Sequence, residues 1–206
     1  MKKIIVIIVA LFMLAFFPFR SSASVKVPSL DSDFASVGLA FLTNLVVHET
    51  GHAAVASYVG ANGIDLQFMT KKDDRFFLGL SHVEHIDEKS RLPYSMGGEV
   101  AVSYTFEYAL SDYRQKPSTY NKALMFFSGT DFLWYSIYAF YLTDGDEAFD
   151  PNAVVDITGL SKGTIFGVAL TQSLINAYRI YSGNDNIAPY FTLDKYSAVF
   201  NVRFIF

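Results

Sequence analysis

The chain has 206 residues, a formal net charge of -4 and no Cys. This length fits one domain or one small membrane bundle, and the acidic balance argues against a nucleic-acid partner. Without Cys there is no disulfide and no thiolate metal site, so any metal must be bound by His and carboxylate groups.

The N-terminus has the pattern of a bacterial secretory signal. Two lysines follow Met1, an apolar run covers residues 4–17, and Ser21-Ser22-Ala23 offers a small-x-small cleavage site. We predict that residues 1–23 are a signal peptide or an N-terminal anchor and that residues 24–206 form a single domain. The expected location is the bacterial cell envelope, either the membrane or the periplasm.

The first predicted helix, residues 35–59, contains the HExxH pattern His48-Glu49-Thr50-Gly51-His52. Positions i and i+4 share a helix face, so His48 and His52 can bind one zinc ion while Glu49 acts as general base. No other charged residue lies between Ala35 and Gly60. Burying a Glu and two His in such a helix is costly without partners, and a metal would supply them. The alternative is a helix that merely holds two satisfied histidines.

A catalytic zinc takes three protein ligands, so one more His or carboxylate is needed. A β-hairpin is predicted over residues 64–87 and a second helix over residues 96–110. This helix opens on Gly97-Gly98, which would permit close approach to the motif helix, and Glu99 follows directly. Glu99 is the first candidate for the third ligand. The alternative is a Glu in the first helical turn, favoured there by the helix dipole.

Asp131 is the second candidate for the third ligand. It lies among aromatic residues in a third predicted helix, residues 120–142, where an unpaired carboxylate is costly. The alternative is an N-cap at a break in that helix. His82, His85 and Asp144 come next in line, although the two histidines are expected to be solvated.

The rest of the chain is predicted to hold one more helix. Residues 144–150 form an acidic segment without the spacing of an EF-hand, which we interpret as a solvated turn closed by Pro151. Asp156 is the expected cap of a fourth helix over residues 159–181, and the tail alternates in polarity. The expected fold is therefore mainly α, with about four apolar helices and a small β-hairpin after the motif helix. Because 51% of the residues are hydrophobic and 17% are charged, the composition is also that expected of a membrane-embedded chain.

The motif and its surroundings resemble two families of membrane metalloproteases, both distantly. His48-Glu49-Thr50-Gly51-His52, the small residues after it and Gly60 resemble the site-2-protease-like family. That resemblance implies that an Asp in a later Asp-Gly element is the third ligand. Asp144-Gly145 has the dipeptide but lies in the acidic segment, so the third ligand stays open. The membrane gluzincins are also similar, and they imply a Glu after the hairpin, which Glu99 matches.

The sequence therefore predicts a zinc-dependent metallopeptidase that acts on a protein or peptide substrate. Glu49 would be its general base, and contact with a membrane is expected. The alternative is a non-enzymatic envelope or membrane protein with a structural or degenerate metal site.

Overall fold

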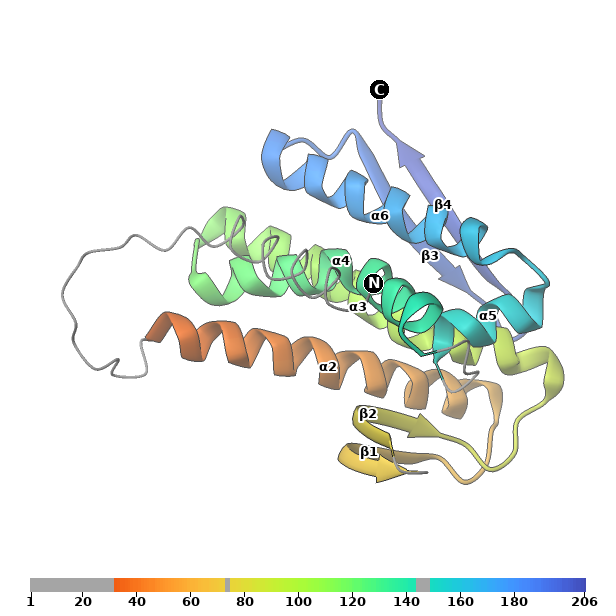
Figure 1. The fold of residues 1–206 in the computed structure, drawn as a ribbon. Helices are drawn as coiled ribbons and strands as arrows, with labels where there is room; N and C mark the ends of the chain where they lie inside the picture. Colours follow the sequence, from red (N-terminus) through yellow and green to blue (C-terminus); the bar gives the residue numbers. More distant parts are fainter. Residues whose placement is uncertain (1–31, 73–74, 144–148) are drawn as a thin grey trace. The chain divides into compact units, whose positions relative to one another are not determined.

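The computed structural model describes residues 32–72, 75–143 and 149–206. The predicted signal segment, residues 1–23, and Asp144 lie outside the described residues. Figure 1 shows the described elements in chain order: α2 (Ser32–Val59), β1 (Asp65–Lys72), β2 (Arg75–His82), a 3-10 turn (Glu88–Ser90), α3 (Arg91–Gln115), α4 (Thr119–Tyr141), α5 (Asp150–Thr158), α6 (Lys162–Ser182), β3 (Ile187–Leu193) and β4 (Ala198–Phe204).

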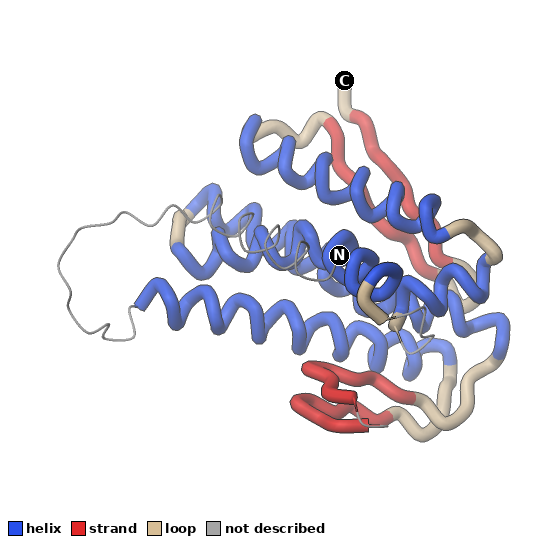
Figure 2. Tube along the Cα trace, in the orientation of Figure 1, coloured by secondary structure: helices blue, strands red, loops and turns tan. Residues whose placement is uncertain are grey.

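Helices dominate the described part of the chain, as the sequence predicts. Helices α2, α3 and α4 pack against one another, and α6 packs on α4. Each of the two antiparallel hairpins is a separate two-stranded sheet (Figure 2). The β1–β2 hairpin lies beside α2, which confirms the predicted hairpin after the motif helix, while β3 and β4 pack against α3 and β3 also contacts α6.

The interior of the bundle is apolar and aromatic where α3, α4, α5, α6 and β3 meet. One contiguous cluster of buried side chains holds these elements together: Met96, Phe132, Ala139, Phe140, Phe149, Val154, Ile165, Ala169 and Phe191. Phe149 stands directly before α5 and packs edge-on to Tyr138 with ring centroids 5.3 Å apart. The start of α5 is therefore anchored to α4 by aromatic packing.

The segment after α4 differs from the prediction. Pro151 does not close a loop but stands in the first turn of α5, where its missing N–H is tolerated. Asp156 is not a cap, because it lies inside α5. The N-cap of α6 is Ser161, whose hydroxyl accepts from the N–H of Thr164 at 3.0 Å. The left-handed Gly159, with φ of 67°, separates the two helices.

Among the residues that the structure describes, none of the helices combines the length and the apolar character that crossing a membrane requires.

Helices α2 and α3 come into backbone contact at a pair of glycines. A Cβ atom built on Gly51 would lie 2.5 Å from the carbonyl oxygen of Gly97 and 2.6 Å from the Cβ of Ala101. A Cβ atom built on Gly97 would lie 2.9 Å from the carbonyl oxygen of Gly51. The prediction that Gly97-Gly98 allows close approach to the motif helix is therefore confirmed.

We expect Gly51→Ala to lower the free energy of unfolding by about 1–3 kcal/mol, because the added methyl has no room in the packed interface. The matched control is Gly38→Ala on the same helix, where a Cβ atom meets nothing within 4 Å. That change should stabilise the protein by about 1 kcal/mol, the helix preference of Ala over Gly. Denaturant unfolding of both variants is the measurement, and equal shifts would contradict the tight packing at Gly51.

Candidate functional site

The two histidines of the motif are buried on one face of α2, with their Nε2 atoms 3.1 Å apart. The Nδ1 of His52 lies 2.7 Å from the carbonyl oxygen of Tyr94 on α3. A carbonyl oxygen can only accept, so Nδ1 of His52 carries a hydrogen and Nε2 is the ring nitrogen that faces His48. The Nδ1 of His48 lies 2.9 Å from Oδ2 of Asp131 on α4. Both Nε2 atoms thus face the same space.

Asp150, the first residue of α5, closes this space from the other side. Its Oδ2 lies 3.4 Å from Nε2 of His48 and 3.1 Å from Nε2 of His52. The three donor atoms lie within 4.8 Å of one another, close enough to hold one metal ion. The interpretation of Asp150 as part of a solvated turn is therefore wrong. The signal in the sequence is an Asp directly before a Pro that starts a helix.

Glu99 is almost completely buried, at 1% exposure, in the middle of α3. Because α3 begins at Arg91, the alternative of a first-turn Glu is wrong. The carboxylate of Glu99 lies within 4.8 Å of donor atoms of His48 and Asp131, while its Oε1 has no hydrogen-bond partner among the described residues. The structure thus groups Glu99 with His48 and Asp131, and Asp150 with His48 and His52. Glu99 as the third ligand stays a prediction.

Asp131 lies in the middle of α4, which runs without a break from Thr119 to Tyr141, so the N-cap alternative is wrong. Both of its carboxylate oxygens contact α2. Oδ1 accepts a hydrogen bond from Nδ2 of Asn44 at 2.6 Å, and Oδ2 faces the ring of His48. Asp131 therefore lies behind His48, on the side of the ring away from Asp150.

Glu49 points toward the β1–β2 hairpin and is buried against β2. A Cβ atom built on Gly79 would lie 2.5 Å from Oε1 of Glu49, so only glycine at this position leaves room for the carboxylate. Burial raises the pKa of Glu49, while the nearby His48 and His52 and the N–H of Ser81 act in the opposite direction. The candidate general base therefore lies buried beside the two histidines.

Gly98 keeps the space beside the two Nε2 atoms open. A Cβ atom built on this residue would lie 2.5 Å from Nε2 of His52 and 2.6 Å from Nε2 of His48. Gly97 and Gly98 therefore have different roles. The first brings α3 against α2, and the second keeps a side chain out of the space beside both Nε2 atoms.

The site concentrates acidic groups around the two imidazoles, and this shifts the pKa values of His48 and Asp150. Burial lowers the pKa of His48, but hydrogen bonds to Asp131 and Asp150 and the charge of Glu99 outweigh it, so the pKa is raised. For Asp150 the reverse holds: burial raises the pKa, but the histidines reduce it below the usual range of an Asp. Burial strongly raises the pKa of Glu99.

The histidines of the hairpin do not join this site. His82 and His85 are exposed, and Nδ1 of His85 lies 2.6 Å from the backbone oxygen of its neighbour Glu84. Neither belongs to a donor cluster among the described residues. Their expected solvated position is confirmed.

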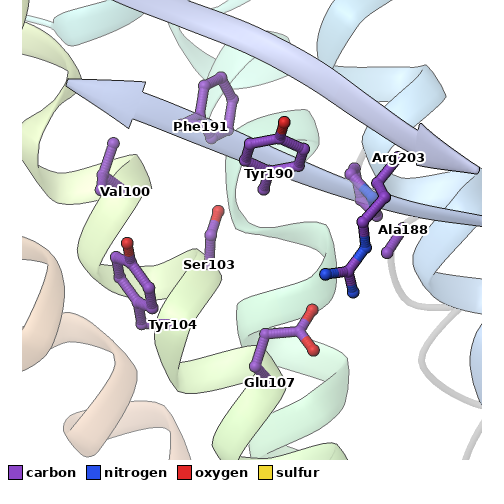
Figure 3. Close-up of a pocket in the computed structure, with 9 residues that line it drawn as sticks. Val100, Ser103, Tyr104, Glu107, Ala188, Tyr190, Phe191 and Arg203 are labelled. Atoms are coloured by element: carbon purple, nitrogen blue, oxygen red, sulfur yellow. The ribbon is translucent and has the colours of Figure 1, made fainter. Parts of the chain in front are cut away.

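A separate groove of about 210 Å³ lies between α3 and the β3–β4 hairpin. Figure 3 shows Ser103, Glu107 and Arg203 around the same space, with Tyr104 and Tyr190 at its sides. The carboxylate of Glu107 is already bound by Arg179. None of the motif residues lines this groove.

Comparison with known proteins adds no family to this geometry. No protein-family model matches the chain, and neither the curated proteins nor the solved structures contain a match.

The raised pKa values predict how the metal-free protein responds to pH. A raised folded-state pKa gives stability that is present below the unfolded pKa and lost as pH rises through the folded value. This loss begins near pH 4.3 for Glu49 and Glu99 and near pH 6.5 for His48. The pKa of Asp150 is reduced, so this residue stabilises the fold above about pH 4. Its contribution to stability is therefore constant between pH 5.5 and 8. Thermal unfolding of chelator-treated protein should therefore occur at a lower temperature at pH 8 than at pH 5.5.

Glu99→Gln should make this pH dependence shallower, because the amide does not titrate. A melting temperature of the metal-free protein that is constant or rises over the same interval would contradict the burial of these protonated groups.

Proposed function

We propose that this protein is a zinc-dependent peptidase of the bacterial cell envelope that hydrolyses a protein or peptide substrate. The observation that carries the proposal is the convergence of one carboxylate oxygen of Asp150 on the Nε2 atoms of His48 and His52, beside Glu49. Two imidazole nitrogens and one carboxylate oxygen are the ligand set of many catalytic zinc sites, and they leave one position open for water or substrate.

The residues present fit such an ion. His52 is held with its Nε2 lone pair available, because its Nδ1 donates to the backbone of Tyr94. Gly98 has no side chain to fill the adjoining space. Zinc prefers nitrogen and oxygen donors of this kind when no Cys is available. His48, His52 and Asp150 would therefore hold the ion, with Glu99 and Asp131 behind His48.

When bound, zinc would polarise the scissile carbonyl and lower the pKa of a water molecule beside it. The carboxylate of Glu49 would take the proton from the attacking water and transfer it to the leaving amine nitrogen. A general base works best when its pKa lies near the working pH, and burial raises the pKa of Glu49 in that direction. The backbone of β2 at Gly79 lies directly against this carboxylate.

The resemblance to site-2-protease-like enzymes is consistent with this ligand set. It implies that the third ligand is an Asp that follows the motif helix and the hairpin in the chain. Asp150 is such a residue and starts a helix, although Pro151 follows it where that family has Gly.

The outer face of α2 supports the proposed contact with a membrane. Leu39, Leu42 and Val46 are exposed along one side of this helix. Apart from the motif, no charged residue occurs between Ala35 and Gly60. An uncharged exposed stripe of this kind is favourable against lipid and unfavourable against water.

The ligand set predicts which carboxylate the metal needs. Purified wild type should contain stoichiometric zinc, and Asp150→Asn should lose most of it, because a neutral amide is a poor zinc ligand. Glu99→Gln is the matched control and should keep its zinc. Elemental analysis after dialysis is the measurement. If Glu99→Gln loses its zinc while Asp150→Asn retains it, then Glu99 is the third ligand and the proposed ligand role of Asp150 is wrong.

Glu49→Gln should keep the fold and the zinc but hydrolyse a labelled casein about 10²–10⁴-fold more slowly, because the amide cannot accept the proton of water. Glu84→Gln, at an exposed position in the loop that follows β2, should keep the wild-type rate. If Glu49→Gln is as active as wild type, the proposed mechanism is wrong. Zinc without hydrolysis in wild type would favour a structural metal site.

A further inference from the structure

Asp131 joins α4 to two consecutive turns of the motif helix. Asn44 stands one helical turn before His48, so both side chains lie on the same face of α2. Oδ1 of Asp131 accepts a hydrogen bond from Nδ2 of Asn44 at 2.6 Å, and Oδ2 lies 2.9 Å from Nδ1 of His48. With one oxygen held by Asn44, the carboxylate has little freedom to rotate away from the imidazole of His48.

This contact determines which nitrogen of His48 is available to a metal, which would replace the hydrogen between Nε2 and Asp150. An ionised carboxylate only accepts hydrogen bonds, so Nδ1 of His48 must carry the hydrogen that it receives. The other nitrogen, Nε2, is then left to face Asp150 and the Nε2 of His52. Without an acceptor behind the ring, the hydrogen could equally occupy Nε2, which would block the lone pair that a metal needs.

The two histidines of the motif are therefore oriented by different means. His52 donates to the backbone oxygen of Tyr94, which no side-chain substitution removes. The acceptor for His48 is a side chain from a helix that supplies none of the three proposed ligands. A carboxylate behind an imidazole ligand also increases the basicity of that ligand.

We propose that Asp131 is a positioning residue for metal binding: it fixes the tautomer and the orientation of His48, and Asn44 holds Asp131 in place. This inference rests on the proposed zinc site of His48, His52 and Asp150. Asp131 is then the hydrogen-bond partner of the ligand His48. It is not the third ligand, which was one of the roles that the sequence suggested for it.

Glu99 provides a matched control for Asp131. Both are carboxyl groups of the bundle interior, and both lie within 4.8 Å of a ring nitrogen of His48. Of the two, only Asp131 makes a hydrogen bond to that ring. An isosteric amide at each position removes a carboxyl group close to His48, and only one of the two substitutions disturbs the hydrogen bond.

The experiment measures the zinc dissociation constant of the full-length protein by competition with a chelator of known affinity. Asp131→Asn and Asp131→Ala should each bind zinc about 10–100-fold more weakly than wild type, the usual effect of losing such a partner. Glu99→Gln should change the constant less than threefold. Asp131→Asn retains the size and shape of the side chain, so it serves as the folded variant if Asp131→Ala does not fold.

Nuclear magnetic resonance of the zinc-loaded protein, labelled with ¹⁵N at His, gives a readout that a merely structural role would not change. The hydrogen on Nδ1 of His48 should give a protected downfield signal in wild type and in Glu99→Gln. In Asp131→Asn that signal should shift upfield or disappear because the hydrogen exchanges rapidly with water.

Equal losses of affinity in Asp131→Asn and Glu99→Gln, or no loss in either, would overturn the role of Asp131. An unchanged Nδ1 signal in Asp131→Asn would do the same. These outcomes differ from failure of the proposed function, which would appear as wild-type protein that binds no zinc.

Discussion

The candidate site depends on the backbone contact between α2 and α3 at Gly51 and Gly97. This contact brings the carbonyl oxygen of Tyr94, one turn before Gly97, within 2.7 Å of the ring of His52. It also places the Cα of Gly98 directly against the two Nε2 atoms. A larger residue at either glycine would separate the helices. The hydrogen bond that orients His52 would then be lost together with the packing. The same close approach of α2 and α3 is therefore needed both for the stability of the bundle and for the geometry of the site.

Local patterns in the sequence predict the part of the site that is local in the chain. The spacing of His48 and His52 follows from helix geometry alone, and the small residues Gly97-Gly98 indicate a close helix contact that the structure confirms. The first hairpin follows from alternating polarity around a charged turn. These features need only short-range information, because each depends on neighbours within one or two turns of the chain.

Asp150 could not be found in this way, because its partner His48 is 102 positions away. A run of acidic residues is normally solvated, and nothing in its spacing indicates that one member is buried. The alternating polarity of the tail indicates strands, but the sequence does not predict that they pair as a second hairpin. Its turn has no Gly and is made by the side chain of Asp194, which accepts from the N–H groups of Tyr196 and Ser197 at 2.7 Å each.

The charges of the site would favour a bound cation. Glu49, Glu99, Asp131 and Asp150 surround two imidazoles, and the ion pairs of these carboxylates in the described structure are made with His48 and, for Asp150, also with His52. Like charges at such short range in a poorly hydrated interior are costly, and a protein reduces this cost by binding protons or a metal. A divalent ion between the imidazoles and Asp150 would compensate much of the remaining negative charge.

The position of Asp150 also has a consequence for the newly made chain. The two proposed imidazole ligands and the proposed base belong to α2, near the beginning of the chain, and α5 follows only after the hairpin and two further long helices. A ribosome therefore exposes the histidines well before it has made the residue that completes their ligand set. Until Phe149 and α5 dock on the bundle, the growing chain would hold zinc by two imidazoles only. A peptidase of the proposed kind would thus acquire its activity late in synthesis, when its own segments are already folded and protected from it.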